Sequence, residues 1–447
     1  MSPYRISFVG LGYVGLSTAV CFATRGFHVY GVDMDENKLS AISKGVVPFY
    51  ERNIDELLDR AIKNRSLIVT PDLGYAVSHS DITFITVGTP SKDDGSVDLS
   101  YVTKASEDIG NALRTKYGYH LVVVKSTVPP GTTSGIVRKI ITDVSNKTSR
   151  EIGIAFNPEF LREGTAVMDT FNPDLVVIGT DDKLAEQTLL SLYDEFYDNK
   201  AKYYITTPSN AEMIKYAVNS FRATQLSFLN MLANLCETIE GADILGVIKG
   251  FSQITKVDQR YLRPGIGFGG SCLPKDVKAL LHQMHKSGVD PSLLQSTLQT
   301  NTEQYKRIFN MINAILGDMK GRSISVLGLA FKANTDDIRE SVAIKLVKLL
   351  YNAGAKVSVY DPRAMENARR VLPVGVRFAR DVVDCIVNSE CCVIATEWDE
   401  FKGLNPEKFK EKMSKPVVID GRRIFDAETF DGTGVLYLPI GRFRKGL

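Results

Sequence analysis

The chain has 447 residues, of which 44 % are hydrophobic and 24 % charged, with a formal net charge of +2. This length exceeds what one ordinary hydrophobic core supports, so two or three domains are expected. The near-neutral charge and the lack of a dense Lys/Arg run argue against nucleic acid as a partner, and no apolar run approaches membrane-spanning length. The six cysteines show no paired spacing, which favours a reducing, cytoplasmic compartment.

The chain opens with a strand–turn–helix–strand pattern over residues 4–33. The turn has the spacing Gly-x-Gly-x-x-Gly, and an acid ends the second strand. Glycines at this spacing permit a tight turn and let a pyrophosphate reach a helix N-terminus, while the acid accepts hydrogen bonds from a ribose. A carboxylate would repel a 2′-phosphate, so the pattern predicts NAD rather than NADP. The predicted contacts are Gly10, Gly12, Tyr13, Val14, Gly15, Asp33 and, as a second ribose contact, Lys38.

Strand and helix patterns continue to alternate in the region that follows. A strand begins at residue 81 and leads into a loop with Thr89, and a strand that begins at residue 120 ends in hydroxyl residues that include Thr127. In a doubly wound sheet, ligands bind outside the carboxyl ends of the strands. Both threonines are therefore expected near the cofactor, although each could equally serve as a turn or capping residue.

A strand over 151–156 leads into a loop that holds two acids, Glu159 and Glu163. Acids are common in solvated loops, but the apolar Phe160 and Leu161 between them are unusual in a merely solvated turn. The loop is therefore a candidate part of a site.

A long helix is predicted from residue 208 to about residue 240, because the stretch from Pro208 to Glu212 has the spacing of a capping box. Lys215 and Asn219 fall one turn apart on the same face of this helix. Lys215 stands among apolar residues. It is either a desolvated cation suited to a developing oxyanion or a surface lysine with a buried stem.

The stretch 265–276, Gly-Ile-Gly-Phe-Gly-Gly-Ser-Cys-Leu-Pro-Lys-Asp, combines four glycines with a cysteine, a lysine and an aspartate. The glycines leave the backbone free to adopt φ > 0 and to approach a ligand. Pro274 suits the first turn of a helix, so Cys272 lies at a helix N-terminus, where the dipole and Lys275 favour the thiolate. Asp276 shares its face and would activate a water against a covalent intermediate. The alternative is a glycine-rich loop with a buried, inert cysteine.

The pattern restarts after a helical stretch over 291–316, with a strand over 323–327, a helix over 341–351 and a strand over 356–360. This order resembles the opening unit, but Gly328 stands alone where three glycines would be. Lys332 and Arg339 occupy that loop, and such cations suit a diphosphate other than that of NAD. His282 and His285 are interpreted as surface residues, because no third metal ligand lies near them.

The predicted fold is therefore α/β, with two Rossmann-like domains joined by a long central helix. The expected domains are an NAD-binding domain over 1–208, a central helical connection and dimerisation region with the cysteine loop over 209–305, and a nucleotide-sugar-binding domain over 306–447.

Six motifs, in order along nearly the whole chain, closely resemble the UDP-glucose/GDP-mannose dehydrogenase family of nucleotide-sugar 6-dehydrogenases. They are Gly12-Tyr-Val-Gly, Lys125-Ser-Thr-Val-Pro-Pro-Gly-Thr, Asn157-Pro-Glu-Phe-Leu-Arg-Glu-Gly, Glu212-Met-Ile-Lys-Tyr, Gly267-Phe-Gly-Gly-Ser-Cys-Leu-Pro-Lys-Asp and Phe331-Lys with Arg339-Glu-Ser.

The resemblance implies a homodimer or higher homo-oligomer that oxidises a sugar C6 alcohol to a carboxylate with two NAD. Cys272 would hold a thiohemiacetal and then a thioester. Lys215 and Asn219 would stabilise oxyanions, and Asp276, Glu159 and Thr127 would handle protons and water. The further contacts implied are Thr89, Thr127, Glu163, Lys275 and Arg339 to the cofactor, and Glu159, Phe160, Leu161, Arg162, Glu163, Lys215, Asn219, Arg260, Phe268, Gly269, Lys332 and Arg422 to the substrate. No metal is implied.

The expected substrate is UDP-glucose and the product UDP-glucuronate, with GDP-mannose or another UDP-sugar as the alternative. Gly164 and the tail from Asp420 resemble the UDP-glucose branch, whereas the short loop before Cys272 resembles the GDP-mannose branch. In the family an arginine from this loop, here Arg260 or Arg263, reaches the substrate of the partner subunit. A protein of another class, an NAD-binding regulator without chemistry, would not need Cys272, Asp276 and Lys215 together.

Overall fold

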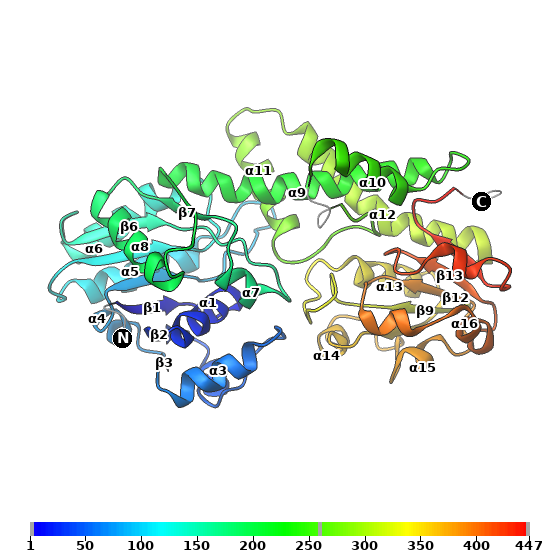
Figure 1. Ribbon diagram of the computed structural model, residues 1–447, viewed down its shortest axis with the longest axis horizontal. Helices are drawn as coiled ribbons and strands as arrows, with labels where there is room; N and C mark the ends of the chain where they lie inside the picture. The colour runs from blue at the N-terminus through cyan, green and yellow to red at the C-terminus, as the bar shows by residue number, and fades with distance from the viewer. Residues whose placement is uncertain (1–3, 258–261, 444–447) are drawn as a thin grey trace. The chain divides into compact units, whose positions relative to one another are not determined.

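The computed structural model describes residues 4–257 and 262–443. The chain divides into two compact units, one made of residues 1–218 and 278–283 and the other of residues 219–277 and 284–447. Each unit holds one sheet, drawn in blue to green and in yellow to red respectively (Figure 1). Within the described ranges, no helix combines the length and the apolar character that crossing a bilayer requires.

The first unit is built on an eight-stranded sheet with the order β3-β2-β1-β4-β5-β6-β7-β8. All neighbours are parallel except β6 and β7. The strand order reverses between β1 and β4, which is where open α/β sheets bind ligands. The strands are β1 (Arg5–Val9), β2 (His28–Val32), β3 (Leu67–Thr70), β4 (Ile82–Ile85), β5 (His120–Val124), β6 (Ile152–Phe156), β7 (Val176–Gly179) and β8 (Tyr203–Thr206).

Helices cover both faces of this sheet (Figure 1). Alternate residues of a strand point to opposite faces, so β5 gives Leu121 and Val123 to the core beneath α1 and α8, and Val122 and Val124 to the core beneath α5 and α6. The helices are α1 (Tyr13–Thr24), α2 (Glu36–Ser43), α3 (Ile54–Lys63), α4 (Leu73–Ser78), α5 (Ser100–Leu113), α6 (Arg138–Ser145) with a preceding π-helical turn (Thr132–Val137), α7 (Ala166–Phe171), α8 (Lys183–Phe196) and the start of α9 (Pro208–Cys236).

The second unit is built on a six-stranded parallel sheet with the order β11-β10-β9-β12-β13-β14. Its strands are β9 (Ser323–Leu327), β10 (Lys356–Tyr360), β11 (Arg377–Phe378), β12 (Cys391–Ile394), β13 (Val417–Asp420) and β14 (Leu436–Pro439). Its helices are the remainder of α9, α10 (Ile244–Thr255), both ends of α11 (Leu273–Lys286), α12 (Ser292–Leu316), α13 (Val342–Asn352), α14 (Met365–Arg369), α15 (Val382–Ile386) and α16 (Pro406–Lys412).

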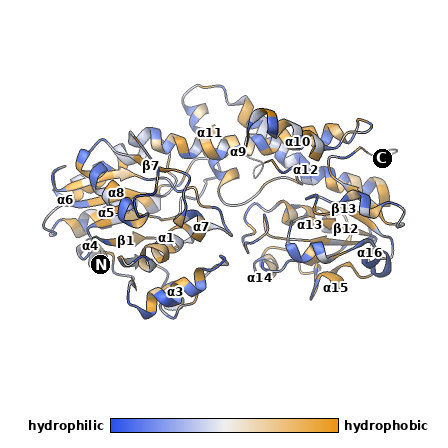
Figure 2. Cartoon of the chain, in the orientation of Figure 1, coloured by the Kyte–Doolittle hydropathy of each residue, from blue (hydrophilic) through white to orange (hydrophobic). Residues whose placement is uncertain are grey.

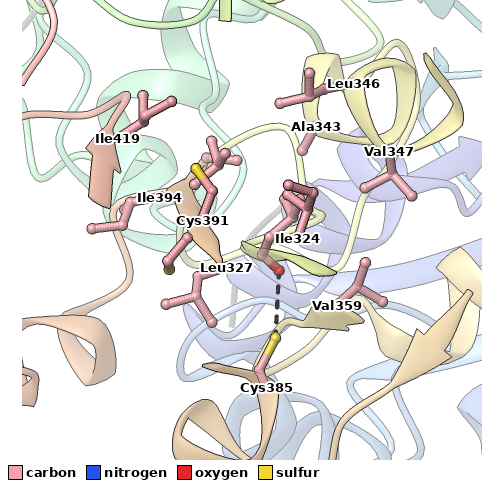
Figure 3. Close-up of a cluster of buried hydrophobic side chains, with 14 of the residues drawn as sticks. Ile324, Leu327, Ala343, Leu346, Val347, Val359, Cys385, Cys391, Ile394 and Ile419 are labelled. Carbon is pink, nitrogen blue, oxygen red and sulfur yellow. Dashed lines mark hydrogen bonds between the residues drawn. The ribbon is translucent and has the colours of Figure 1, made fainter. Parts of the chain in front are cut away.

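The core of the second sheet is apolar, and its strands are drawn mainly in hydrophobic colours (Figure 2). Figure 3 shows Ile324, Val359 and Ile394 from three strands packed with Leu346 of α13, and Cys385 of α15 donating to the carbonyl of Val326. Cys385, Cys391 and Cys392 are buried here, so these thiols serve as small apolar side chains.

The two sheets begin in the same way, which confirms the predicted pair of Rossmann-like folds. Gly10 follows β1 with φ of +98°, and its N–H donates to the carbonyl of Val32 at 2.8 Å. Gly328 follows β9 with φ of +99°, and its N–H donates to the carbonyl of Tyr360 at 2.8 Å. A left-handed backbone of this kind favours glycine.

The predicted capping box at the start of α9 is wrong. The cap is Thr207, whose Oγ1 accepts from the N–H of Asn210 at 3.3 Å. The carboxylate of Glu212 instead accepts from the N–H groups of Gly131 and Thr133, at 2.6 and 2.8 Å. These donors lie at the start of the π-helical turn that precedes α6, and they satisfy a carboxylate that is fully buried.

Phe22 of α1 is expected to be a large contributor to the stability of the first unit. It is 1 % exposed and stacks on Phe196 with ring centroids 4.2 Å apart. Phe22→Ala should cost about 3–5 kcal/mol, because it leaves a cavity in a packed core. The measurement is the thermal midpoint, with Tyr117→Ala as the control, since Tyr117 is 96 % exposed. Equal midpoints for the two variants would contradict this account.

Candidate active site

The turn after β1 can accept a dinucleotide. A Cβ on Gly15 would overlap the carbonyl oxygen of Gly10, so α1 packs against the turn as closely as glycine allows. Gly12 caps α1 without a side-chain hydrogen bond to its first N–H groups. Uncapped N–H groups and the helix dipole suit a pyrophosphate.

Asp33 follows β2 as an ionised carboxylate. Its Oδ2 accepts from the N–H of Leu11 and from Lys38 Nζ, both at 2.8 Å. Partial burial acts to raise the pKa of Asp33, but the bonds from Lys38 and from backbone N–H groups outweigh it and hold the pKa below its usual value. An anionic acid in this place can accept bonds from ribose hydroxyls, so the residues of this turn fit NAD. The predicted ribose contact of Lys38 stays a prediction.

Asp361 occupies the equivalent position after β10 but is saturated by the fold. Its Oδ2 accepts from the N–H groups of Leu329 and Ala330 and from Trp398 Nε1, and its Oδ1 accepts from the N–H groups of Arg363 and Ala364. A carboxylate offers about four lone-pair sites, and Asp361 is buried. No acceptor capacity remains for a ribose, so the second sheet does not repeat the dinucleotide site.

A buried ion pair joins Glu159, after β6, to Lys215 of α9. Lys215 Nζ donates to the Glu159 carbonyl at 2.6 Å and to its Oε1 at 2.8 Å, and the two side chains are 4 % and 7 % exposed. The hydrogen bond from the N–H of Leu161 to Glu159 Oε2 measures 2.7 Å. Burial acts to raise the pKa of Glu159, but the charge of Lys215 and these bonds leave it below its usual value. Lys215 is therefore a desolvated cation, not a surface lysine.

Lys125, directly after β5, is a second buried lysine that the sequence analysis missed. Its Nζ donates to Asn157 Oδ1 at 2.7 Å, and Asn157 Nδ2 donates to the carbonyl of Val177 at 2.7 Å. Lys125 is 8 % exposed. Both residues lie in the motifs quoted above, but a lysine at a strand end carries no periodic signal of burial.

The sequence analysis also missed Glu51, which connects three segments that lie far apart in the chain through hydrogen bonds. Its buried carboxylate accepts from the N–H groups of Gly164 and Ala166, at 2.6 and 2.9 Å, and from the hydroxyl of Tyr13. Glu51 thereby fixes the end of the loop that carries Glu163 against the start of α1. Arg162 of the same loop forms an ion pair with Asp169, with Nη2 and Oδ1 2.6 Å apart.

Cys272 is exposed and lies immediately before α11, as predicted, so it is not a buried, inert cysteine. Its carbonyl accepts from the N–H of Asp276 at 2.8 Å, and Ser271 Oγ lies 3.5 Å from its Sγ. A thiol at the N-terminus of a helix feels the positive end of the dipole, which favours the thiolate. All six cysteines are thiols, and the other five are buried.

Asp276 is fully buried and held on both sides of its carboxylate. Asn219 Nδ2 donates to its Oδ2 and Lys275 Nζ to its Oδ1, each at 2.6 Å. The charge of Lys275 is therefore shared with this carboxylate and does not act on the thiol alone.

Gly267 and Gly270 adopt positive φ, at +114° and +85°, as predicted, and close packing adds a second reason for glycine in this loop. A Cβ on Gly269 would lie 2.5 Å from the carbonyl oxygen of Glu340, and one on Gly270 would lie 2.8 Å from the Phe331 ring. The N–H of Gly270 also donates to the carbonyl of Arg339 at 2.9 Å. The loop thus lies against the chain around residues 331–340 of its own unit, and this contact leaves no room for side chains.

The remaining predicted residues occupy varied surroundings. Thr89 is buried after β4, Thr127 is half-buried after β5, and the N–H of Phe268 donates to Asn301 Oδ1 at 2.7 Å. Arg260 lies outside the described residues. Lys332 Nζ lies 5.6 Å from the centroid of the Phe331 ring, Arg339 pairs with Asp337, and Arg422 Nε donates to the carbonyl of Ala395 at 2.7 Å.

Among the side chains that the structure describes, no group of three or more His, Cys, Asp or Glu could hold a metal ion.

Family models cover most of the chain. Residues 4–197, 209–303 and 325–427 match the NAD-binding, central and UDP-binding domains of the UDP-glucose/GDP-mannose dehydrogenase family. The chain is 39 % identical to UDP-glucose 6-dehydrogenase TuaD of Bacillus subtilis, over 98 % of this chain and 93 % of that protein. It is 40 % identical to UDP-glucose 6-dehydrogenase of Rhizobium meliloti, over 98 % and 99 %. The structure of a UDP-glucose dehydrogenase from Pyrobaculum islandicum is similar, with a TM-score of 0.91, 37 % identity and 98 % of each chain covered.

Asp33→Ala is expected to weaken NAD binding by about 1–3 kcal/mol, the scale of a lost charge-assisted hydrogen bond. The measurement is NAD affinity by titration calorimetry. Asp35→Ser is the matched control, because Asp35 caps α2 through the N–H of Lys38 and a serine keeps such a cap. Equal losses of NAD affinity in both variants would mean that the negative charge near this turn, rather than a contact between Asp33 and the ribose, governs binding.

Proposed function

The chain belongs to the UDP-glucose/GDP-mannose dehydrogenase family and is an NAD-dependent oxidoreductase, and we propose that it oxidises the C6 hydroxyl of UDP-glucose to the carboxylate of UDP-glucuronate. The observation that carries this proposal is the exposed Cys272 at the start of α11. Oxidation of an alcohol to an aldehyde needs a hydride acceptor and a base but no thiol. A nucleophilic cysteine is useful only when the aldehyde must be trapped and oxidised again.

The substrate assignment draws on the second sheet. Residues 325–427 match a UDP-binding domain, and the relatives described above are UDP-glucose dehydrogenases. The carboxylate of Asp361 is fully occupied by hydrogen-bond donors of the fold. The same unit holds three cations, Lys332, Arg339 and Arg422. Such cations suit the diphosphate of a nucleotide sugar.

The first oxidation removes a hydride and a proton from the C6 alcohol and leaves an aldehyde. The turn after β1 and Asp33 would hold NAD, which would supply the hydride acceptor; two NAD would be needed for the four electrons of the whole reaction. Cys272 Sγ then adds to the aldehyde carbon and forms a thiohemiacetal. Lys215 and Asn219 donate hydrogen bonds to the oxygen that becomes negative.

The second oxidation removes the hydride from the thiohemiacetal carbon and leaves a thioester on Cys272. Water adds to this thioester, the C–S bond breaks, and the products are the carboxylate and the thiolate. Asp276 and Glu159, with Thr127, take and return the protons. The lowered pKa of Glu159 keeps its carboxylate ionised, so it can accept a hydrogen bond from the attacking water. An exposed nucleophilic thiol stays reduced in a reducing compartment, which supports the predicted cytoplasmic location. The homodimer stays a prediction.

Cys272→Ala should abolish formation of the acid while leaving NAD affinity unchanged, because the thiol acts after the cofactor has bound. The assay is the release of UDP-glucuronate, measured by anion-exchange chromatography. Cys236→Ala is the control for a general effect of removing a thiol, since Cys236 is buried near the end of α9. Acid production by Cys272→Ala at the wild-type rate would refute the covalent mechanism.

Competition between equal amounts of UDP-glucose and GDP-mannose should give UDP-glucuronate as the main product. A site built for the hydrogen-bond pattern of uracil leaves polar groups unpaired when guanine binds, so kcat/KM is expected to differ by about tenfold or more. The products separate by charge. A preference for GDP-mannose would reassign the substrate and leave the proposed roles of Cys272 and Lys215 in place.

A further inference from the structure

We propose that Asn301 of α12 is a positioning residue for Cys272: its side-chain amide holds the backbone of Phe268 and so fixes the glycine loop that presents the thiol. The inference rests on the proposed function, because it assigns a further residue to the same reaction. It goes beyond that function because Asn301 lies in none of the motifs quoted above and acts on the reaction only through the loop.

The loop before Cys272 has little means of fixing its own conformation. Four of the residues 265–270 are glycines, and Gly267 and Gly270 adopt φ of +114° and +85°. Glycine has more backbone conformations available than any other residue. A nucleophile, in contrast, must be held within about 3–3.5 Å of the atom that it attacks. The position of Cys272 must therefore be set by contacts from outside the loop.

Asn301 makes two hydrogen bonds to one residue of this loop. Its Oδ1 accepts from the N–H of Phe268 at 2.7 Å, and its Nδ2 donates to the carbonyl of Phe268 at 2.9 Å. Two bonds to the same residue fix the orientation of the backbone as well as its position. Gly267 allows this approach, because a Cβ there would lie 3.0 Å from Asn301 Oδ1. The fixed residue precedes Cys272 by four positions.

The helix that carries Asn301 is a well-packed support. Ile308, Ile312 and Leu316 of α12 are buried in the core of the second sheet. The loop is also held at Gly270, but by the carbonyl of Arg339, which belongs to a segment without helix or strand. Groups held by regular elements are placed more precisely than groups held by loops. Asn301 therefore ties the loop to the more precise of these two supports.

A second helix holds only the start of the loop. Asn230 of α9 accepts from the N–H of Gly265 at 2.8 Å, seven residues before Cys272. Three residues and two further glycine positions separate this bond from the one at Phe268 or follow it, so it leaves the later part of the loop unconstrained. The helical contact nearer to Cys272 is the one from Asn301.

The helix itself gives no reason for an asparagine at this position. Asparagine is a weak helix former, and an amide is costly to bury without hydrogen-bond partners. Asn301 is nevertheless 8 % exposed and lies well inside α12. Its partners are backbone groups of the cysteine loop. The residue thus serves the loop rather than the helix.

Loss of this contact is expected to affect the two oxidations unequally. The first oxidation needs a hydride acceptor and a base but no thiol, so it continues. Addition of Cys272 Sγ to the aldehyde carbon needs the loop in place and becomes slower. Part of the aldehyde then leaves the site before the C–S bond forms. Complete oxidation gives two NADH per carboxylate, so the escape of aldehyde raises this ratio above two.

The test uses Asn301→Leu and Asn301→Ala. Both substitutions remove the two hydrogen bonds, but leucine adds volume and alanine removes it, so an effect that both share belongs to the lost bonds. The assay contains saturating NAD and UDP-glucose, with semicarbazide to capture free aldehyde as the semicarbazone with loss of water. We expect acid formation to fall about tenfold or more, the semicarbazone to appear, and the NADH formed per acid to exceed two. A smaller folded fraction would lower NADH and acid equally and leave the ratio at two.

Hydrogen exchange gives a second readout that needs no substrate. The backbone N–H groups of residues 265–272 are expected to exchange at least about tenfold faster in both variants, because the loop opens more often. The measurement is mass spectrometry of the peptide that contains these residues. The KM for NAD should stay at the wild-type value, since Asp33 and the glycine turn after β1 belong to the other unit.

Gln304 provides the matched control, because it is a second buried amide on α12. It is 5 % exposed, and its Nε2 donates to the carbonyl of Thr300 in the same helix at 3.4 Å. Gln304→Leu therefore removes an amide of similar burial whose bond stays within α12. This variant is expected to keep two NADH per acid and the wild-type exchange rate of residues 265–272.

Four results would overturn the proposal: a ratio of two in the Asn301 variants, wild-type exchange of the loop, an effect confined to one of the two variants, or the same changes in Gln304→Leu. A wild type that forms no NADH from UDP-glucose or GDP-mannose would refute the proposed function, and the exchange rates would then still show whether Asn301 holds the loop. An active wild type with unaltered Asn301 variants would refute the inference alone.

Discussion

The buried ion pair between Glu159 and Lys215 is the constraint that holds the loop after β6 against the start of α9. A charge taken out of water is costly unless a partner and further hydrogen bonds compensate it, so each residue requires the other. Lys215 lies on α9, and one turn further Asn219 binds the buried carboxylate of Asp276, four residues beyond Cys272. One helix therefore supplies a donor to each of two buried carboxylates, and the position of both donors follows from helical spacing alone.

The two sheets show how similar folds acquire different chemistry. Each begins with a strand, a glycine at positive φ, a helix and a strand that ends at an aspartate. Asp33 accepts from three donors and keeps room for a further hydrogen bond, whereas Asp361 accepts from five donors, among them the indole of Trp398. The difference lies in what surrounds the acid rather than in the backbone that presents it.

Sequence reasoning found the features that local pattern encodes. Buried strands such as β5, the first glycine turn and the position of Cys272 before a helix all depend on residues within one short stretch. It failed where a partner lies far along the chain. The capping box at Glu212 was wrong because donors some eighty residues earlier bind that carboxylate, and the roles of Glu51 and Lys125 were missed for the same reason. The domain limits and the roles of individual site residues stay predictions.

The uneven burial of the cysteines makes the native chain a selective target for thiol reagents. Five of the six cysteines are buried, and Cys272 is exposed. A mild alkylating agent can thus be directed at a single position without any engineered substitution. Stoichiometry above one label per chain would then report that a core has opened, which gives a chemical readout of local unfolding in the intact protein.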